Sequence, residues 1–202
     1  MATANASDQL TLVKSHRVNE KVQATIAVYS EDGTRVAISY RDFSMNGFNN
    51  KVLVWDLDRW KKVALIRGCS DQVDGLAFSH DGKRLVCVGG SPKRFMGGVI
   101  VVWNTKTWKV ERTIEADDFY SLHRVALSST GKHMATGSAL SGGADDKIEL
   151  WSFPKCRKLR SFAKSKGDID WLSFSPDGKN LAVGMPTDRA ASVWTIPAGK
   201  KR

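Results

Sequence analysis

The chain has 202 residues, of which 42% are hydrophobic and 26% are charged, and its formal net charge is +10. This composition is ordinary for a globular protein, and the positive charge permits contact with nucleic acid or another acidic surface without deciding the fold. The three cysteines share no ligand-like spacing and no stretch approaches 18 apolar residues, so the sequence predicts no disulfide framework, zinc site or membrane span.

The N-terminal region precedes the regular part of the chain. Residues 1–9 are expected to be disordered, and residues 10–14 form one extra strand. The first fifteen residues lack a basic start followed by an apolar run, so we expect no secretory signal. We therefore expect a cytoplasmic protein, with the nucleus as the alternative.

An apolar strand that ends in tryptophan recurs four times after this region. The four tryptophans are 48, 48 and 43 residues apart, and the glycines of the turns upstream of them are 49, 49 and 47 residues apart. The two markers are Trp55, Trp103, Trp151 and Trp194, and Gly33, Gly82, Gly131 and Gly178. Two unrelated markers with one period indicate a repeat protein.

The second repeat gives the clearest pattern of elements. It predicts four short strands joined by tight turns, at residues 73–79, 84–89, 99–103 and 108–114. Several third strands are nearly continuous apolar runs, which indicates burial on both faces of each sheet. Radial packing of small sheets about an axis satisfies that requirement, so we expect a β-propeller. The repeated tryptophans are then packing residues, and Trp108 and Trp171 are also expected to pack between sheets.

Three segments carry a resemblance to the WD40-repeat family: Phe-Ser-Pro-Asp-Gly at 174–178, Phe-Ser-His-Asp-Gly at 78–82 and Val-Leu-Val-Trp-Asp-Leu at 52–57. The resemblance extends from about residue 10 to residue 199. It implies an all-β, WD40-like propeller of four four-stranded blades. The family places Gly-His before each repeat, and that His joins a buried polar network. In this chain only His16 keeps that residue, with a longer spacing to its turn, and the other repeats have different residues there. We therefore expect the network to be mostly absent and stability to depend on packing.

The last repeat lacks a fourth strand, and strand 10–14 is expected to complete it. The predicted propeller then covers residues 10–199, followed by a basic tail at 200–202. Four blades are the low end for propellers. The chain either closes alone, forms half of an eight-bladed homodimer, or belongs to a larger propeller.

No recognisable catalytic or metal-binding pattern accompanies the repeats. Residues 42–47 resemble the start of a calcium loop, but Leu53 occupies the position of the bidentate Glu. The four histidines lie beside no recognisable nucleophile, and no phosphate loop is present. We therefore predict no catalytic residues, metal or cofactor, no small-molecule substrate and no enzyme; an enzyme with an unrecognised site is the least favoured alternative.

The loops between the second and third strands are the best candidates for partner binding. Such loops gather on one rim of a propeller, and two of them carry the aromatic, Met and basic residues that interface hot spots favour. The predicted partner-binding residues are Arg41, Phe43, Met45, Phe48, Lys93, Arg94, Phe95 and Met96. The sequence thus favours a non-catalytic protein–protein interaction scaffold.

Lysines and arginines collect in the outermost strands and would form a basic outer belt. The alternative function is therefore a nucleic-acid or ribonucleoprotein-associated binder that contacts RNA or another polyanion. The predicted polyanion-binding residues are Lys155, Arg157, Lys158, Arg160, Lys164 and Lys166. Lysine on an edge strand also blocks pairing with other sheets, which is the competing explanation of the belt.

Overall fold

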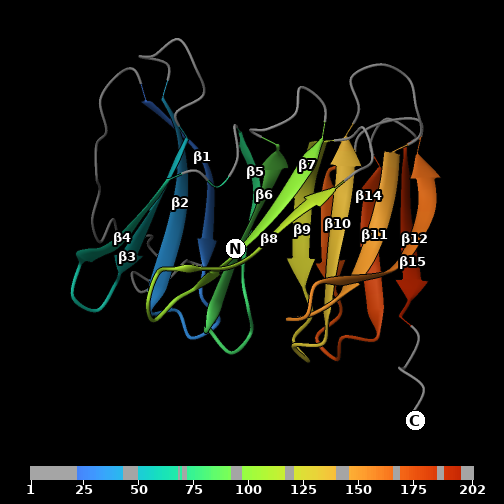
Figure 1. Cartoon of the computed structure of the whole chain (residues 1–202). Helices are drawn as coiled ribbons and strands as arrows, with labels where there is room; N and C mark the ends of the chain where they lie inside the picture. The colour runs from blue at the N-terminus through green and yellow to red at the C-terminus, as the bar shows by residue number, and fades with distance from the viewer. Residues whose placement is uncertain are drawn as a thin grey trace, which may run out of the picture.

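The computed structural model describes residues 22–42, 50–67, 69, 72–91, 97–116, 121–139, 146–165, 169–185 and 189–196 (Figure 1). These residues form four antiparallel sheets, here called blades 1 to 4, in which consecutive strands are neighbours. Blade 1 contains β1 (Val22–Tyr29), β2 (Arg35–Asp42), β3 (Lys51–Asp56) and β4 (Lys61–Arg67). Blade 2 contains β5 (Val73–Phe78), β6 (Arg84–Gly90), β7 (Gly98–Asn104) and β8 (Val110–Ala116).

Blades 3 and 4 continue the same pattern. Blade 3 contains β9 (Ser121–Leu127), β10 (His133–Ala139), β11 (Asp146–Ser152) and β12 (Arg157–Ser165). Blade 4 contains β13 (Trp171–Phe174), β14 (Asn180–Met185) and β15 (Ala190–Thr195). The predicted completing strand, residues 10–14, lies outside the described residues, as do residues 1–9, residues 200–202 and the loops at 43–49 and 92–96. The predicted WD40-like architecture of four blades is confirmed.

The blades pack in chain order through their first strands. Strand β5 packs against β1, β9 packs against β5 and β6, and β13 packs against β9 and β10. No comparable packing joins β1 to β13 among the described strands. Blade 1 and blade 4 accordingly lie at opposite ends of the series in Figure 1. The described strands of one chain therefore do not close a ring.

Three apolar clusters fill the spaces between neighbouring blades. In β6, Leu85 belongs to the cluster shared with blade 1, whereas Val86 and Val88 belong to the cluster shared with blade 3. The third cluster joins Ile148 of blade 3 to Leu181 of blade 4. Because alternate side chains of a strand point to opposite faces, both faces of the middle blades must be apolar. The prediction of burial on both faces is confirmed for β6 and β7.

The turn between the first and second strands is the same hydrogen-bonded unit in three blades. In blade 1 the Ser30 hydroxyl donates to Asp32 Oδ1 at 2.6 Å and accepts from the Arg35 N–H at 2.9 Å. Asp32 Oδ1 also accepts from the Thr34 N–H at 3.0 Å. Ser79 with Asp81 and Ser175 with Asp177 repeat the arrangement. The turn glycine follows with φ between 64° and 69° in all four blades, a conformation that other residues rarely adopt.

The tryptophans only partly follow the sequence prediction. Trp151 is 4% exposed, and its Nε1 donates to Thr136 Oγ1 at 3.0 Å, which is a piece of the buried polar network. Trp108 lies in a turn with φ 53° rather than in a strand, and it packs partly against the cluster between blades 1 and 2. The prediction was wrong for Trp171, which is 67% exposed because no described blade follows blade 4.

Replacing Thr136 with Val should destabilise the protein by about 1–3 kcal/mol. The substitution keeps the side-chain shape but leaves the buried Trp151 N–H without its acceptor, and an unpaired buried donor costs about that much. Thr113→Val on the exposed face of β8 is the matched control and should change stability by less than about 0.5 kcal/mol. Denaturant unfolding of both variants measures the difference, and equal stabilities would contradict the prediction.

The turn carboxylates predict a loss of stability in acid. Hydrogen bonds from Ser30 and from the Thr34 backbone and hydroxyl lower the pKa of Asp32 from 3.8 to about 2. A lowered folded-state pKa contributes stability above the unfolded value, and this contribution disappears as the pH falls toward 2. Asp32→Asn should therefore reduce the slope of unfolding free energy against pH between about 4 and 2. Asp58→Asn, at an exposed position of another turn, is the control. A slope equal to that of the wild type would show that the turn does not act in this way.

Candidate functional site

The first strands of three blades carry a β-bulge at the same place. The pairing register shifts between Ala24 and Ile26 in β1 and between Val73 and Gly75 in β5, and β9 has an equivalent shift opposite Gly137 and Ser138. The extra residues are Thr25, Asp74 and His123, each eight residues before a turn glycine. A bulge leaves its extra residue outside the ladder and redirects its side chain, and bulges are enriched beside functional sites.

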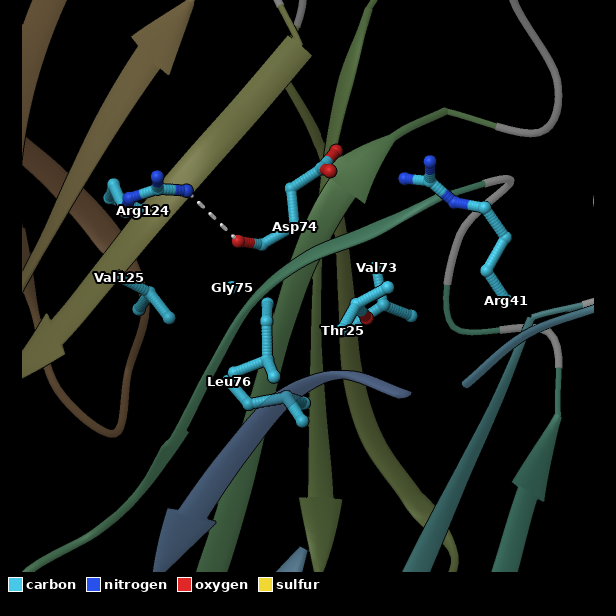
Figure 2. Close-up of a pocket in the computed structure, with 9 residues that line it drawn as sticks. Thr25, Arg41, Val73, Asp74, Gly75, Leu76, Arg124 and Val125 are labelled. Atoms are coloured by element: carbon cyan, nitrogen blue, oxygen red, sulfur yellow. Dashed lines mark hydrogen bonds between the residues drawn. The ribbon is translucent and has the colours of Figure 1, made fainter. Parts of the chain in front are cut away.

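A pocket of about 310 Å³ lies among the first strands of blades 1, 2 and 3. It is lined by Thr25, Ile26, Arg41, Val73, Asp74, Gly75, Leu76, Arg124 and Val125. Figure 2 shows Asp74 between two guanidinium groups, with Arg124 on one side and Arg41 on the other. The pocket therefore combines an aliphatic floor with a few convergent polar groups, the usual character of a binding site.

Arg124 joins three blades. Its Nε donates to the Asp170 carbonyl of blade 4 at 2.6 Å, and its Nη1 donates to the carbonyls of His123 at 3.0 Å and of Asp74 in blade 2 at 3.4 Å. Its Nη2 also lies 3.4 Å from Asp170 Oδ1. These contacts hold the guanidinium at the side of the pocket.

The Asp74 carboxylate lies among donors and cations. Gln72 Nε2 donates to Asp74 Oδ1 at 2.6 Å, and His123 Nε2 lies 3.9 Å from Oδ2. Burial raises the pKa of Asp74, and the Gln72 hydrogen bond and the charges of His123, Arg41 and Arg124 oppose this effect. The carboxylate is thus a partly desolvated hydrogen-bond acceptor at the edge of the pocket.

Arg41 supplies the unsatisfied donor of the site. Its Nε is buried and has no hydrogen-bond partner in the part of the chain that the structure describes. Figure 2 shows its guanidinium directed toward the pocket and Asp74. A carbonyl or carboxylate oxygen from a bound molecule would satisfy this donor.

The chemistry of the pocket is suited to binding. Its polar groups are two arginines, a carboxylate and a hydroxyl, and the Thr25 hydroxyl lies 2.6 Å from Ser39 Oγ. No group of three or more His, Cys, Asp or Glu side chains that could hold a metal ion occurs among the described residues. The described chain also contains no helix of the length and apolarity that a membrane crossing needs.

The structure tests the predicted rim residues only in part. Arg41 is described, at the end of β2, and it lines the pocket. The other seven lie outside the described residues, namely Phe43, Met45, Phe48, Lys93, Arg94, Phe95 and Met96. Their role in partner binding stays a prediction.

The predicted polyanion-binding residues do not form one uniform surface. Lys155, Arg157 and Arg160 are exposed, and the last two lie on the outermost strand β12. Lys158 instead forms an ion pair with Glu149 at 2.5 Å and lies 5.7 Å from the centre of the Trp151 ring. Lys166 and the side chain of Lys164 lie outside the described residues.

Sequence reasoning missed most of the pocket, including Gln72, Asp74, His123 and Arg124. A usable signal was present in the repeat. The position eight residues before each turn glycine is polar in every repeat. Thr25, Asp74 and His123 hold it within the first strands of blades 1 to 3, and Asp170 holds it immediately before β13. A side chain that is polar in every repeat marks a position that does not belong to the core.

Comparisons with known proteins agree with the architecture. The family model described as "WD domain, G-beta repeat" matches residues 156–195. A p21-activated protein kinase-interacting protein 1-like from Danio rerio is 34% identical over 79 residues, which cover 39% of this chain and 21% of the relative. The B-type cell cycle switch protein ccs52B from Medicago truncatula is 21% identical over 165 residues, 81% of this chain and 32% of the relative.

A third match is shorter and more similar. The guanine nucleotide-exchange factor SEC12 from Rattus norvegicus is 40% identical over 53 residues, 26% of this chain and 12% of the relative. The matched region spans about a third or less of the length of each of these relatives. The repeat period, the four stacked blades and these matches support membership of the WD40-repeat family.

Proposed function

We propose that this chain is a non-catalytic protein-interaction module whose partner inserts a segment into the pocket beside Arg41 and Asp74. The observation that carries the proposal is the buried Arg41 Nε, which has no described acceptor and whose guanidinium points into a preformed pocket. Buried polar groups are normally hydrogen-bonded, so a bound partner that supplies an oxygen would remove this defect.

The geometry also indicates the kind of group that the pocket would accept. Arg41 and Arg124 stand on either side of Asp74, and Ile26, Leu76 and Val125 line the apolar part of the pocket. A side chain with an oxygen at its end and a short apolar stem fits both parts. The pocket volume of about 310 Å³ is at the lower end of ligand sites, which suits one or two side chains of a peptide.

The relatives' names are consistent with a role in interaction. One is named an interacting protein and another a cell cycle switch protein, whereas a third is named an exchange factor. Because the matched region spans only part of each relative, the names support the class of function and do not identify a partner.

Changing the pocket should abolish partner capture without unfolding the protein. In affinity purification from a cell extract, Arg41→Gln and Asp74→Asn should each lose at least tenfold of a partner retained by the wild type, because each removes a charged contact of the site. Arg67→Gln, on the exposed outermost strand of blade 1, is the matched control and should retain the partner. Retention of the same partner by all three variants would overturn the proposal.

A second candidate function uses the exposed basic residues of β12. Phosphate contacts release counterions, so binding to RNA through this strand should weaken steeply as salt increases. Arg157→Glu with Arg160→Glu should flatten the slope of log affinity against log salt, whereas Arg35→Glu, in blade 1, should not. The Lys158–Glu149 ion pair already neutralises one charge of the group, so we rank this candidate second. An absence of RNA binding by the wild type at about 50 mM salt would exclude it.

A further inference from the structure

A groove of about 460 Å³ lies at the internal junction between blades 1 and 2. It is lined by the turns between the first and second strands and between the third and fourth strands of both blades, and by one residue of β4. The turns between the first and second strands lie at the lower ends of these strands in Figure 1. The groove is here called the turn groove, and its cationic and apolar side chains are Arg35, Arg59, Val63, Lys83, Lys106 and Trp108.

Hydrogen bonds between turns hold the walls of the turn groove in place. In blade 2 the Thr105 hydroxyl donates to the Gly82 carbonyl at 2.6 Å, and the Thr105 N–H donates to the Lys83 carbonyl at 3.0 Å. In blade 1 the Leu57 N–H donates to the Thr34 carbonyl at 2.8 Å. Each wall is therefore one connected pair of turns. A groove with fixed walls lowers the cost of ordering the site when a partner binds.

Trp108 occupies a backbone position at which the turn itself would favour glycine. Its φ is 53°, and its N–H donates to the Asn104 carbonyl at 2.8 Å. A bulky residue adopts this conformation at a cost, and such costs are found most often at functional sites. The indole ring packs partly against the apolar cluster between blades 1 and 2, and it lines the turn groove with Val63, which is 38% exposed. The groove therefore has an apolar wall that a partner's side chain can cover.

The three carboxylates of the turn groove already accept hydrogen bonds from their own turns. Asp32 and Asp81 belong to Ser-x-Asp-Gly units, and the Oδ1 atom of each accepts from a serine hydroxyl and from a backbone N–H. Asp56 Oδ1 accepts from the Arg59 N–H at 2.9 Å, and Asp56 Oδ2 lies 3.5 Å from Arg59 Nη1. These bonds leave the carboxylates with little capacity to accept from a ligand.

The cations of the turn groove are less occupied than its carboxylates. Within the part of the chain that the structure describes, no hydrogen bond or ion pair engages the side chains of Arg35, Lys83 and Lys106. Four cations therefore face three carboxylates, and most of the free hydrogen-bonding capacity belongs to donors. The whole chain also carries a net charge of +10. Both the local and the overall charge favour an anionic ligand.

We propose that the turn groove binds an acidic peptide segment of a partner protein. Carboxylate side chains of this segment pair with the guanidinium and ammonium groups of the groove, and an apolar side chain between them covers Trp108 and Val63. The volume lies within the range of ligand sites. No residue lines both this groove and the pocket beside Arg41 and Asp74, so the inference is independent of the proposed function.

Isothermal titration calorimetry of the full chain at low salt tests the proposal with a synthetic peptide in which glutamates flank a leucine. The wild type should bind this peptide saturably. Lys83→Glu with Lys106→Glu should weaken binding by about tenfold or more, because the reversed charges repel the glutamates. Arg67→Glu with Lys132→Glu is the matched control, since it reverses the same number of charges at exposed positions outside the groove. The control should bind within about twofold of the wild type.

Trp108→Gly separates the role of the indole ring from the conformation of the turn. Glycine suits a φ of 53°, so the turn is kept while the apolar wall is lost, and peptide affinity should fall by about tenfold or more. Trp60→Gly is the control, because Trp60 has the same kind of conformation in the equivalent turn of blade 1, with φ 48°, and does not line the groove. This control should bind the peptide as the wild type does.

Three results would overturn the proposal. The first is an absence of saturable peptide binding by the wild type, and the second is equal weakening by the two charge-reversed variants. The third is single-stranded RNA that competes with the peptide and binds the wild type more tightly, which would make the groove a polyanion site. Circular dichroism melting confirms that each variant is folded.

Discussion

Packing between blades is the constraint on which the rest of the molecule depends. Each sheet has only three or four short strands, and such a sheet is marginal unless its apolar face is covered. In the middle blades both faces are apolar, so Val86 and Leu85, adjacent in sequence, enter two different cores. No blade is then stable by itself, and the stability of each depends on its neighbours, as in other stacked repeats.

Hydrogen bonds fix the turn between the first and second strands of a blade, whereas apolar packing fixes the positions of neighbouring blades. The Ser-x-Asp-Gly unit satisfies its own polar atoms within six residues and reaches no other blade through the Ser30–Asp32–Arg35 bonds. Contacts between blades are mostly apolar, and Arg124 is an exception because it donates to carbonyls of blades 2 and 4. The hydrogen bonds within each turn are therefore largely separate from the packing between blades, although the Ser129 hydroxyl in the turn of blade 3 donates to the Pro176 carbonyl in the turn of blade 4 at 2.6 Å.

The separation explains which features could be predicted from sequence. Turn glycines and strand-ending tryptophans depend on local conformation and on period, so they identified the blades and most strand limits. The position of Trp171 could not be predicted, because its exposure depends on whether another blade follows it. Sequence reasoning missed the pocket because it is formed by three β-bulges, at which the strand pairing shifts by one residue. No Gly or Pro common to the three bulges marks them in the sequence. The loop composition predicts Arg41 as a binding residue, whereas the burial of its Nε without a partner depends on packing in three dimensions.

The bulged residue of each first strand has a consequence for how this surface can change over evolution. Thr25, Asp74 and His123 are absent from the strand pairing and from all three apolar clusters. A substitution at one of them alters the chemistry presented to the pocket while leaving the ladder and the cores as they were. Blades 1 to 3 thus each carry one position at which a point mutation can change what the surface binds, while the strand pairing and the apolar clusters stay as they are.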